Sequence, residues 1–310
     1  MSIKPKVSIC IPTYNQTTYL KILLDSIDQQ TFSNYEIIIS DDSITSEVKT
    51  LVDRFHFGEK LKYFRNKPSL GSPSNWNAAI SKASGEYIKI MHHDDAFTAA
   101  TSLNEMVSLL EANNYDYVFA GSKIENVKDP GQNRVHRIRK FNRLLRKPYL
   151  LFFGNSIGGP SALLVKKKKF AEIQYNPAFI WLVDIEYYIR LFLESSNGNI
   201  ISQPLILTHD AAEHRLTSTI LRDFELQIKE EAMLYDLLRP KVPAITKFFM
   251  QVHLVRLFFK ARTRNKELII LFKQTPPLLN IYFSLVKLKP LYFAYYLFIR
   301  LLDLTRKILY

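Results

Sequence analysis

The sequence predicts an α/β protein with a mostly parallel, doubly wound sheet, followed by a basic, aromatic-rich helical region. In the first two thirds of the chain, short β-branched and aromatic runs alternate with helical apolar stripes. Two of the predicted strands end in paired aspartates, Asp41-Asp42 and Asp94-Asp95. Residues 239–310 contain 14 Lys and Arg against 2 Asp and Glu, whereas the rest of the chain is nearly neutral.

The composition indicates a globular chain of two parts. Its 310 residues, 47% of them hydrophobic, suffice for one substantial core plus an appendage. The change in charge predicts a boundary between a domain at 1–238 and a tail at 239–310. The single Cys10 excludes an internal disulfide framework and fits the cytoplasm. Residues 1–6 lack a signal-peptide core, and the late apolar run at 291–299 is too short to span a bilayer.

The first predicted strand, residues 7–11, ends at Pro12, whose missing N–H interrupts a strand ladder. The next segment is an amphipathic helix, because apolar residues recur at helical spacing: Leu20, Leu23, Leu24 and Ile27. The second strand, 35–39, leads into the first aspartate pair. The pattern then predicts, in order, a helix over about 45–55, a strand at 61–65 and a helix over about 75–83.

The fourth predicted strand, residues 87–91, leads into the second aspartate pair. An isolated pair could simply cap the next helix, since Asp is a favoured N-cap. Two pairs on neighbouring strands instead indicate a shared site, because ligands bind beyond the carboxyl ends of strands in such sheets. Adjacent carboxylates repel one another unless a cation offsets them, and Mg²⁺ or Mn²⁺ suits these oxygen ligands.

The remaining elements follow the same alternation. A strand is predicted at 117–120, a turn-rich segment at 155–161 before a strand at 162–165, and a strand at 200–207. Two further helices are predicted from apolar stripes: Leu103, Met106, Val107 and Leu110, then Ile185, Tyr188, Ile189 and Phe192. Seven Lys and Arg between residues 134 and 147 indicate either a solvated face or mobile loop, or a lid or acceptor loop around Arg137 that attracts phosphates.

Three motifs together resemble the family 2 glycosyltransferases: Val-Ser-Ile-Cys-Ile-Pro-Thr-Tyr-Asn at 7–15, Ile-Ser-Asp-Asp-Ser at 39–43, and Ala-Ser-Gly-Glu-Tyr-Ile at 83–88 followed by Asp-Asp. The resemblance covers roughly residues 5–220. It implies the A-type glycosyltransferase fold. It also implies inverting, metal-dependent transfer of a sugar, from a UDP- or dTDP-linked donor to a glycan or lipid-linked acceptor, in bacterial surface polysaccharide synthesis.

The resemblance also assigns the donor site. Donor-binding residues would be Pro12, Thr13, Tyr14, Asp41, Asn77 and Asp94, with Asp41 at the base and Asn77 near the ribose and diphosphate. Asp94 and Asp95 match the end of the family's Asp-x-Asp motif, with Asp95 the expected principal ligand of Mg²⁺ or Mn²⁺. His92 replaces the usual first Asp of that motif, which predicts weaker cation binding. His92 and His93 are either ligands themselves or packing and donor-contact residues.

The catalytic base implied by the resemblance is Asp184, with Arg190 six positions later. The acidic residue that usually precedes this base is replaced by Val183. Some family members complete the metal or diphosphate site with a later His or Arg, and His214 is expected here because Arg215 follows it. A base at this point would remove the proton of the acceptor hydroxyl as it attacks the anomeric carbon.

The tail mixes Phe and Tyr with Lys and Arg. This composition suits a membrane interface, where aromatic rings are buried and cations meet anionic headgroups. We therefore expect peripheral attachment to an anionic membrane surface at the cytoplasmic face of the cell membrane. A helical bundle that packs on the enzyme or in a dimer would give the same pattern. No RNA-binding motif accompanies the charge, so no nucleic-acid partner is expected.

Two other functions stay open at this point. A protein that binds nucleotide sugars without turnover fits the replacement of an Asp by His92. A nucleotidyltransferase could also use a parallel sheet and paired aspartates, but it would need a Gly-rich, cationic first loop. Residues 12–15, Pro-Thr-Tyr-Asn, do not form such a loop.

Overall fold

The computed structural model describes residues 4–210, 223–261, 266–285 and 288–309. The chain forms two compact units. The first contains Met1–Arg146 and Ser156–Glu213, and the second contains Lys147–Asn155 and His214–Tyr310. The second unit therefore includes α9 (Phe224–Leu238), which the charge pattern assigned to the N-terminal domain.

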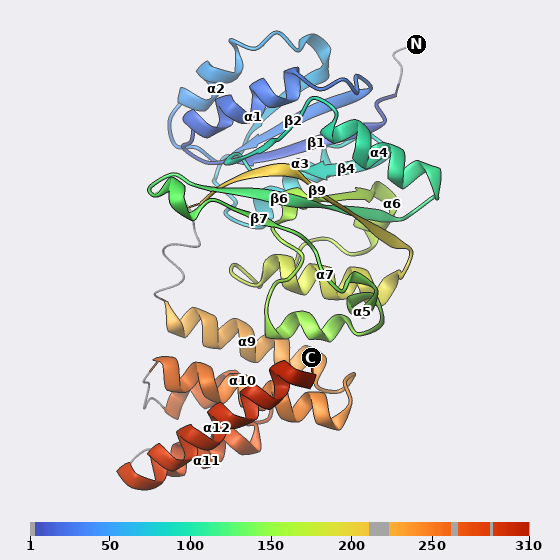
Figure 1. Ribbon diagram of the computed structural model, residues 1–310. Coiled ribbons are helices and arrows are strands. Elements are labelled where there is room, and N and C mark those ends of the chain that lie inside the picture. The colour runs from blue at the N-terminus through green and yellow to red at the C-terminus, as the bar shows by residue number, and fades with distance from the viewer. Residues whose placement is uncertain (1–3, 211–222, 262–265, 286–287, 310) are drawn as a thin grey trace. The chain divides into compact units, whose positions relative to one another are not determined.

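The first unit is built on a sheet of nine strands among the described residues (Figure 1). In chain order they are β1 (Val7–Thr13), β2 (Tyr35–Asp41), β3 (Leu61–Arg65), β4 (Tyr87–Ile90), β5 (Asp95–Phe97), β6 (Tyr117–Asn126), β7 (Arg134–His136), β8 (Leu163–Lys166) and β9 (Gly198–Asp210). Across the sheet the order is β3-β2-β1-β4-β8-β6-β9-β5, with β7 paired to β6. β3, β2, β1 and β4 are parallel, as are β6 and β9. β8 is antiparallel to both neighbours, β4 and β6.

Helices cover both faces of this sheet. Those of the first unit are α1 (Thr18–Asp28), α2 (Glu47–Val52), η1 (Gly58–Lys60), α3 (Ser74–Ser81), α4 (Ser102–Ala112), η2 (Pro130–Gln132), α5 (Phe141–Arg146), η4 (Pro160–Ala162), α6 (Lys167–Glu172) and α7 (Val183–Glu194). In Figure 1, α1 and α2 lie above the sheet, and α5 and α7 lie below it. The sequence prediction of an α/β fold with this alternation is confirmed.

The buried faces of two helices are the stripes that the sequence predicts. Leu20, Leu23, Leu24 and Ile27 are the buried residues of α1. The four apolar residues predicted to face the core in α4 are buried as well. Each such side chain contributes about 1.5–3 kcal/mol when it is removed from water, so these two faces fix the helices on the sheet.

Pro12 does not end the first strand, contrary to the sequence-based expectation. β1 continues to Thr13, with Pro12 opposite Ser40 of β2. On the other side, the last paired residue of β1 is Cys10, opposite Ile90. A proline is tolerated here because β4 has already ended, so no neighbouring strand needs its N–H.

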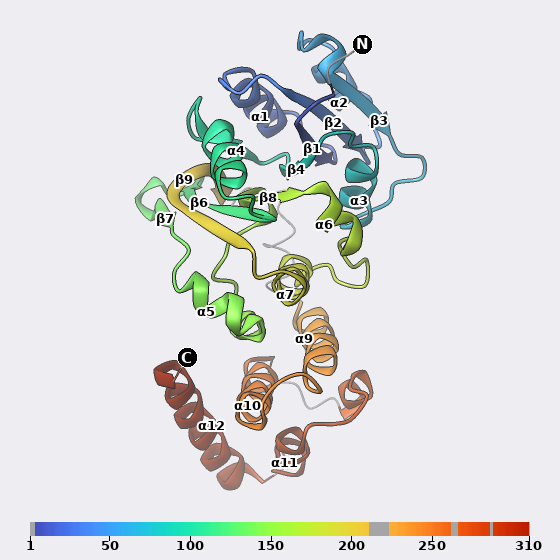
Figure 2. The ribbon, with the colours of Figure 1, turned by 90° about the vertical axis from the view of Figure 1, so that its right-hand side faces the viewer.

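The second unit is helical in the residues described. Its elements are η3 (Pro148–Phe153), α9, α10 (Ala244–Ala261), η5 (Lys266–Leu271), α11 (Pro277–Leu285) and α12 (Lys289–Leu309). Figure 2 shows α10, α11 and α12 next to one another, and the core between them includes Phe258 and Tyr282. None of the described helices is both long enough and apolar enough to cross a membrane.

Asp303 on α12 is the main acidic partner inside this helical unit. It lies 2.6 Å from Arg256 of α10 and 2.9 Å from Arg306. Burial would raise the pKa of Asp303, but these two arginines hold it below its usual value. By sequence the unit holds 18 Lys and Arg against 7 Asp and Glu, so its cations outnumber its acidic residues.

Candidate active site

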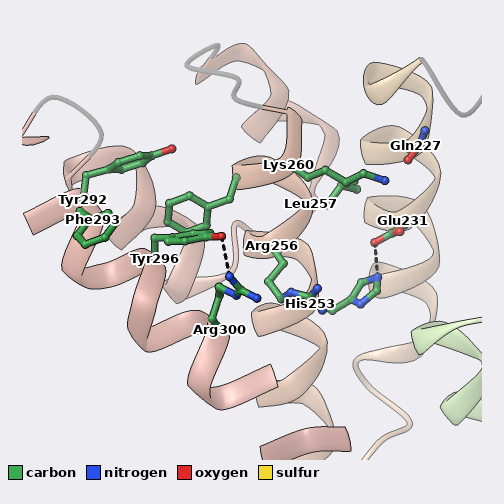
Figure 3. A pocket seen from close by; sticks show the side chains of 11 residues that line it. Gln227, Glu231, His253, Arg256, Leu257, Lys260, Tyr292, Phe293, Tyr296 and Arg300 are labelled. Carbon is green, nitrogen blue, oxygen red and sulfur yellow. Dashed lines mark hydrogen bonds and ion pairs between the residues drawn. The ribbon is translucent and has the colours of Figure 1, made fainter. Parts of the chain in front are cut away.

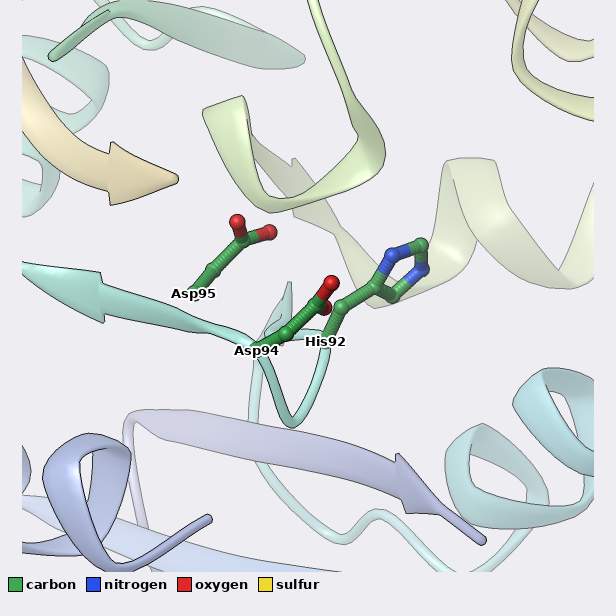
Figure 4. Close-up of side chains that lie close together, drawn as sticks. All are labelled: His92, Asp94 and Asp95. Carbon is green, nitrogen blue, oxygen red and sulfur yellow. The ribbon is translucent and has the colours of Figure 1, made fainter. Parts of the chain in front are cut away.

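The turn between β4 and β5 brings together three side chains that could hold a metal ion. Ligand atoms of His92, Asp94 and Asp95 lie within 4.8 Å of one another, and Figure 4 shows the three side chains projecting from this turn. β5 begins at Asp95, and the next helix starts only at Ser102. The aspartate pair is therefore not a helix cap, and that alternative interpretation is wrong.

The two aspartates of this turn differ in exposure. Asp95 is 5% exposed, and the side chains of Ser161 and Thr208 hydrogen-bond to its carboxylate. Burial, and then the adjacent charge of Asp94, raise the pKa of Asp95. Asp94 and His92 are partly exposed, so Asp94 offers the more accessible carboxylate and Asp95 supports it from inside.

The backbone of the turn is held at two points. Ser161 Oγ accepts a hydrogen bond from the His92 N–H at 2.9 Å, and the Asp95 N–H donates to the His92 carbonyl at 3.0 Å. Near the end of β9, His209 Nδ1 lies 2.8 Å from the carbonyl oxygen of Asp94. These bonds hold the backbone from which the two carboxylates project, and such support positions the ligands of a metal site.

Aromatic rings line the side of the turn where His92 lies. The centre of the His92 ring is 4.4 Å from that of Trp76, and the ring centres of Trp76 and Tyr175 are 5.2 Å apart. His209, which contacts the Asp94 carbonyl oxygen, packs against Tyr19, with the two ring centres 4.7 Å apart. His92 is therefore packed as well as placed near the two carboxylates.

Lys89 lies beneath this turn, at the centre of β4 and completely buried. Its Nζ donates to the carbonyl oxygens of Ser161 and Leu163. Burial lowers the pKa of Lys89 to about 7, although the charge of Asp95 acts in the opposite direction. A role for Lys89 was not predicted from the sequence, where the available signal was a lysine inside an otherwise apolar strand.

The first aspartate pair is used inside the protein. Asp41 accepts hydrogen bonds from the Tyr63 hydroxyl at 2.5 Å and from the Ser43 N–H at 2.8 Å. Asp42 accepts bonds from the Asn66 side chain and from two N–H groups of the loop at 70–71. Neither belongs to the metal-compatible group found among the described residues.

The loop after β1 is fastened to this pair. The Thr13 carbonyl oxygen accepts hydrogen bonds from the Asp42 N–H at 3.0 Å and from the Asn75 side chain at 3.3 Å. The next residue, Tyr14, is 49% exposed. The buried hydroxyl of Thr13 has no hydrogen-bond partner in the described part of the chain. Of the predicted nucleotide-binding residues, Thr13 thus offers an unused polar atom, Tyr14 an open surface, and Pro12 a buried strand position.

Asn77 and Asp184 lie around Tyr175. The Asn77 side chain forms two hydrogen bonds with the Tyr175 backbone, at 2.8 and 3.1 Å. This pairing was not expected from the sequence, and a role of Asn77 near the ribose stays a prediction. Asp184 lies in the first turn of α7 and is partly exposed. Burial raises the pKa of Tyr188 most, and the charges of Asp184 and Asp95 raise it further. Both carboxylates therefore lie near the Tyr188 side chain.

Arg190, the expected companion of Asp184, is bound elsewhere. Its guanidinium forms a two-point ion pair with Glu186, with both N–O distances 2.7 Å. It also donates to the Gln174 carbonyl oxygen. Glu186 is 3% exposed, and both partners belong to α7, so the pair stabilises the helix itself while the bond to Gln174 ties the helix to the preceding segment.

Two remaining predictions concern later segments. His214, the expected third metal ligand, lies outside the described residues, as does Arg215. The basic segment contains β7 and α5, and Arg134 forms an ion pair with Asp210 at 3.0 Å. Most of the basic side chains of this segment are exposed, which agrees with a solvated face, and a role as a lid stays a prediction.

Curated proteins with related sequences include glycosyltransferases. Abequosyltransferase RfbV from Salmonella typhimurium is 30% identical over 219 residues, which cover 65% of this chain and 66% of that protein. A GalNAc(5)-diNAcBac-PP-undecaprenol beta-1,3-glucosyltransferase from Campylobacter jejuni is 28% identical, over 57% of this chain and 59% of its own. The matches thus span about two thirds or less of these relatives.

Solved structures show the same fold. S. aureus TarS 1-349 in complex with UDP-GlcNAc has a TM-score of 0.62 and 17% identity, covering 82% of this chain and 73% of that one. The mannosyltransferase PcManGT from Pyrobaculum calidifontis, in complex with GDP-Man and Mn²⁺, has a TM-score of 0.57 and 16% identity, covering 98% and 88%. The predicted A-type glycosyltransferase fold is confirmed.

A model of one protein family matches this chain directly. The description of that family is "Glycosyl transferase family 2", and the match extends over residues 8–173. This range includes β1, β2 and the turn with the three potential metal ligands. More than half of the sequence fits the model, and the fold agrees with it. The chain belongs to glycosyl transferase family 2.

Proposed function

We propose that this protein transfers a sugar, with inversion, from a nucleotide-diphosphate sugar to a hydroxyl of a glycan or lipid-linked acceptor in surface polysaccharide synthesis. The observation that carries the proposal is the group of His92, Asp94 and Asp95 after β4 in a family 2 chain. The names of the Salmonella and Campylobacter relatives and the UDP-GlcNAc bound to TarS support it. The donor base is proposed to be uracil or thymine.

The side chains after β4 fit a divalent cation. Two carboxylates and one imidazole offer ligand atoms within 4.8 Å, and oxygen ligands suit Mg²⁺ or Mn²⁺ while imidazole favours the latter. The raised pKa of Asp95 reflects burial and the neighbouring charge of Asp94, a repulsion that a cation would relieve. When bound, Mg²⁺ or Mn²⁺ would neutralise the charge that develops on the departing nucleotide diphosphate.

Asp184 is the proposed base. Its position in the first turn of α7 favours the ionised carboxylate, because the helix N-terminus carries partial positive charge. An ionised carboxylate can accept the proton of the acceptor hydroxyl as that oxygen attacks the anomeric carbon. The bond from Arg190 of α7 to the Gln174 carbonyl oxygen would help to keep this carboxylate in place during the reaction.

The second unit is proposed to hold the protein on the cytoplasmic face of the cell membrane. By sequence, this unit has 18 Lys and Arg against 7 Asp and Glu. A cation near an anionic leaflet contributes on the order of 1 kcal/mol to binding. Attachment of this kind would keep the catalytic unit near a lipid-linked acceptor.

The test uses the full chain with a panel of nucleotide sugars, with Mn²⁺ or with a chelator. At least one donor should raise the melting temperature in a cation-dependent way, because a ligand of the folded state stabilises it. Asp184→Asn should keep this shift and lower transfer by roughly 10²–10⁴-fold. A matched control is Glu194→Gln at the far end of α7, which should transfer normally.

The outcomes separate the candidate functions. If no donor shifts the melting temperature, the proposed donor site is wrong. If a donor binds but no transfer occurs to any free or lipid-linked sugar, the protein is a nucleotide-sugar binder, an alternative that the His92 replacement favours. If Asp184→Asn loses donor binding as steeply as transfer, Asp184 belongs to the donor site.

A further inference from the structure

The helical unit contains a pocket of about 910 Å³ that plays no part in the proposed transfer chemistry. Residues of α9, α10 and α12 line it, and Figure 3 shows their side chains. Those that matter for its chemistry are Glu231, Arg256, Lys260, Tyr296 and Arg300. All of them belong to the second unit.

The charge of this pocket is positive. Glu231 is paired with His253 at 3.1 Å, and Arg256 is paired with Asp303. Lys260 and Arg300 have no carboxylate partner within ion-pair distance among the residues the structure describes. Lys260 lies 5.5 Å from the centre of the Phe224 ring, and Arg300 lies 5.8 Å from the centre of the Tyr296 ring and donates a hydrogen bond to the Tyr296 hydroxyl at 3.4 Å. Two cations in the wall are therefore available to an anion.

The rest of the wall is aromatic. The centre of the Phe259 ring is 4.9 Å from the ring centre of Tyr292 and 5.2 Å from that of Tyr296. Phe293 also lines the pocket, although 61% of this residue is exposed. A ligand that fits this wall has an anionic group and an apolar portion.

An exposed apolar stripe continues from the pocket along α12. It comprises Phe293, Leu297, Leu301 and Leu304, which are 51–62% exposed. Their spacing of i, i+4, i+8 and i+11 places them on one face of the helix. No charged residue belongs to this stripe, and Arg300 lies at its border. An apolar face beside cations is the arrangement by which interfacial helices lie on lipid.

We propose that this pocket takes up the phosphate headgroup of an anionic membrane lipid, which Lys260 and Arg300 attract from different parts of its wall, while the α12 stripe enters the acyl-chain boundary. The inference rests on the membrane attachment proposed above and gives it a specific site. Phosphate is the expected anion because both cations can donate hydrogen bonds to its oxygens. A lipid is favoured over a free phosphate compound because the stripe provides for acyl chains.

The experiment measures sedimentation of the full chain with vesicles of phosphatidylglycerol and phosphatidylcholine, and with phosphatidylcholine alone. The test variant is Lys260→Gln/Arg300→Gln. The control is Lys241→Gln/Lys273→Gln, which removes the same charge from exposed positions of the same unit outside the pocket. If binding depended only on diffuse attraction of about 1 kcal/mol per cation, both variants would lose the same binding free energy. The proposal expects the pocket variant to bind at least about tenfold more weakly than the control, the equivalent of 1.4 kcal/mol.

Further arms identify the ligand. Leu297→Gln/Leu301→Gln should also lose vesicle binding, with an unchanged helical circular dichroism spectrum. Short-chain phosphatidylglycerol below its micelle concentration should raise the melting temperature of the wild type, and inorganic phosphate at the same concentration should not. Equal stabilisation by phosphate would assign the pocket to a free phosphate compound and overturn the proposal.

Equal vesicle binding by the pocket variant and the control would overturn the pocket proposal as well. Such a result would mean that diffuse charge attraction alone accounts for membrane binding. Absence of vesicle binding by the wild type would contradict both the pocket and the membrane attachment. Neither result affects sugar transfer, because the donor-dependent melting shift of the same variants reports on the first unit. A lost donor shift with intact vesicle binding would instead contradict the glycosyltransferase proposal alone.

Discussion

Asp41 and Asp42 after β2 contrast with Asp94 and Asp95 after β4, although each pair follows a buried parallel strand. The first pair accepts hydrogen bonds from backbone N–H groups and neutral side chains of the surrounding loops. The second pair stands in a group of potential metal ligands. In the first pair the fold supplies the donors to both carboxylates, whereas the second pair is the proposed site of a cation.

This contrast shows what an aspartate pair at the end of a strand can do. Where the next loop returns over the strand, as at residues 66–71, its N–H groups satisfy the carboxylates and the loop becomes rigid. Where the chain turns at once into another strand, as at Asp95, side chains from distant segments, Ser161 and Thr208, hold the buried carboxylate. The pair there remains part of a group of potential metal ligands.

The largest expected effect is on the second pair. Asp94→Asn and Asp95→Asn should each lower Mn²⁺-dependent transfer by about 10³-fold or more, because each removes negative charge needed to hold the cation. Steady-state transfer assays over a range of Mn²⁺ concentrations measure this. A variant with full Mn²⁺-dependent transfer would remove that aspartate from the metal site.

The first pair should respond in stability instead. Asp42→Ala removes the acceptor for three donors, which should lower the free energy of unfolding by about 2–3 kcal/mol. Thermal and urea denaturation measure it. The control is Asp53→Ala, whose exposed ion pair with Lys49 should contribute less than about 1 kcal/mol. If Asp42→Ala is as stable as this control, the loop does not depend on the pair.

Glu36, on the same strand as Asp41, provides a test by pH. Burial would raise its pKa, but hydrogen bonds from Lys62, Ser8 and Ser84 hold it at about 2. Because the folded pKa lies below the unfolded value, this stabilisation is complete above about pH 4.5 and is lost as the pH falls toward 2. Wild type should lose up to about 2–3 kcal/mol more than Glu36→Gln over that window. Parallel acid slopes in urea denaturation would contradict this.

The smallest expected effect concerns the support behind the second pair. Ser161→Ala removes the acceptor of the His92 N–H and a hydrogen bond to the Asp95 carboxylate. Stability should fall by about 1 kcal/mol, and the Mn²⁺ concentration for half-maximal transfer should rise. Thr208→Val tests the second hydrogen bond to Asp95 in the same assay. If both variants keep the wild-type Mn²⁺ dependence, the hydrogen bonds to Asp95 do not tune the site.

The sequence predicts well what depends on local pattern. The buried stripes of α1 and α4 and the bounds of β3 follow from spacing and residue type. β5 was missed because Asp-Ala-Phe after a turn has no strand signal of its own. β8 lies between β4 and β6 although it follows both in sequence, an order that no local pattern encodes.

The site divides in the same way. Asp94 and Asp95 were predicted as neighbours in one turn, and they lie together with His92. The contributions of Ser161, Thr208 and His209 come from distant segments, and their sequence context is ordinary. Only the pairing of strands brings them to the turn, so sequence patterns alone could not assign them.

The route of the chain between the two units limits how this protein can recombine. The segment with η3 leaves the first unit after Arg146 and returns at Ser156. Within the second unit, Phe152 of that segment lies 5.5 Å from His253. A shortened or chimaeric chain that exchanges only the C-terminal helices would therefore leave this buried phenylalanine without its partner. Gene fusion at a single breakpoint cannot exchange the helical unit intact, so its inheritance is tied to that of the catalytic sheet.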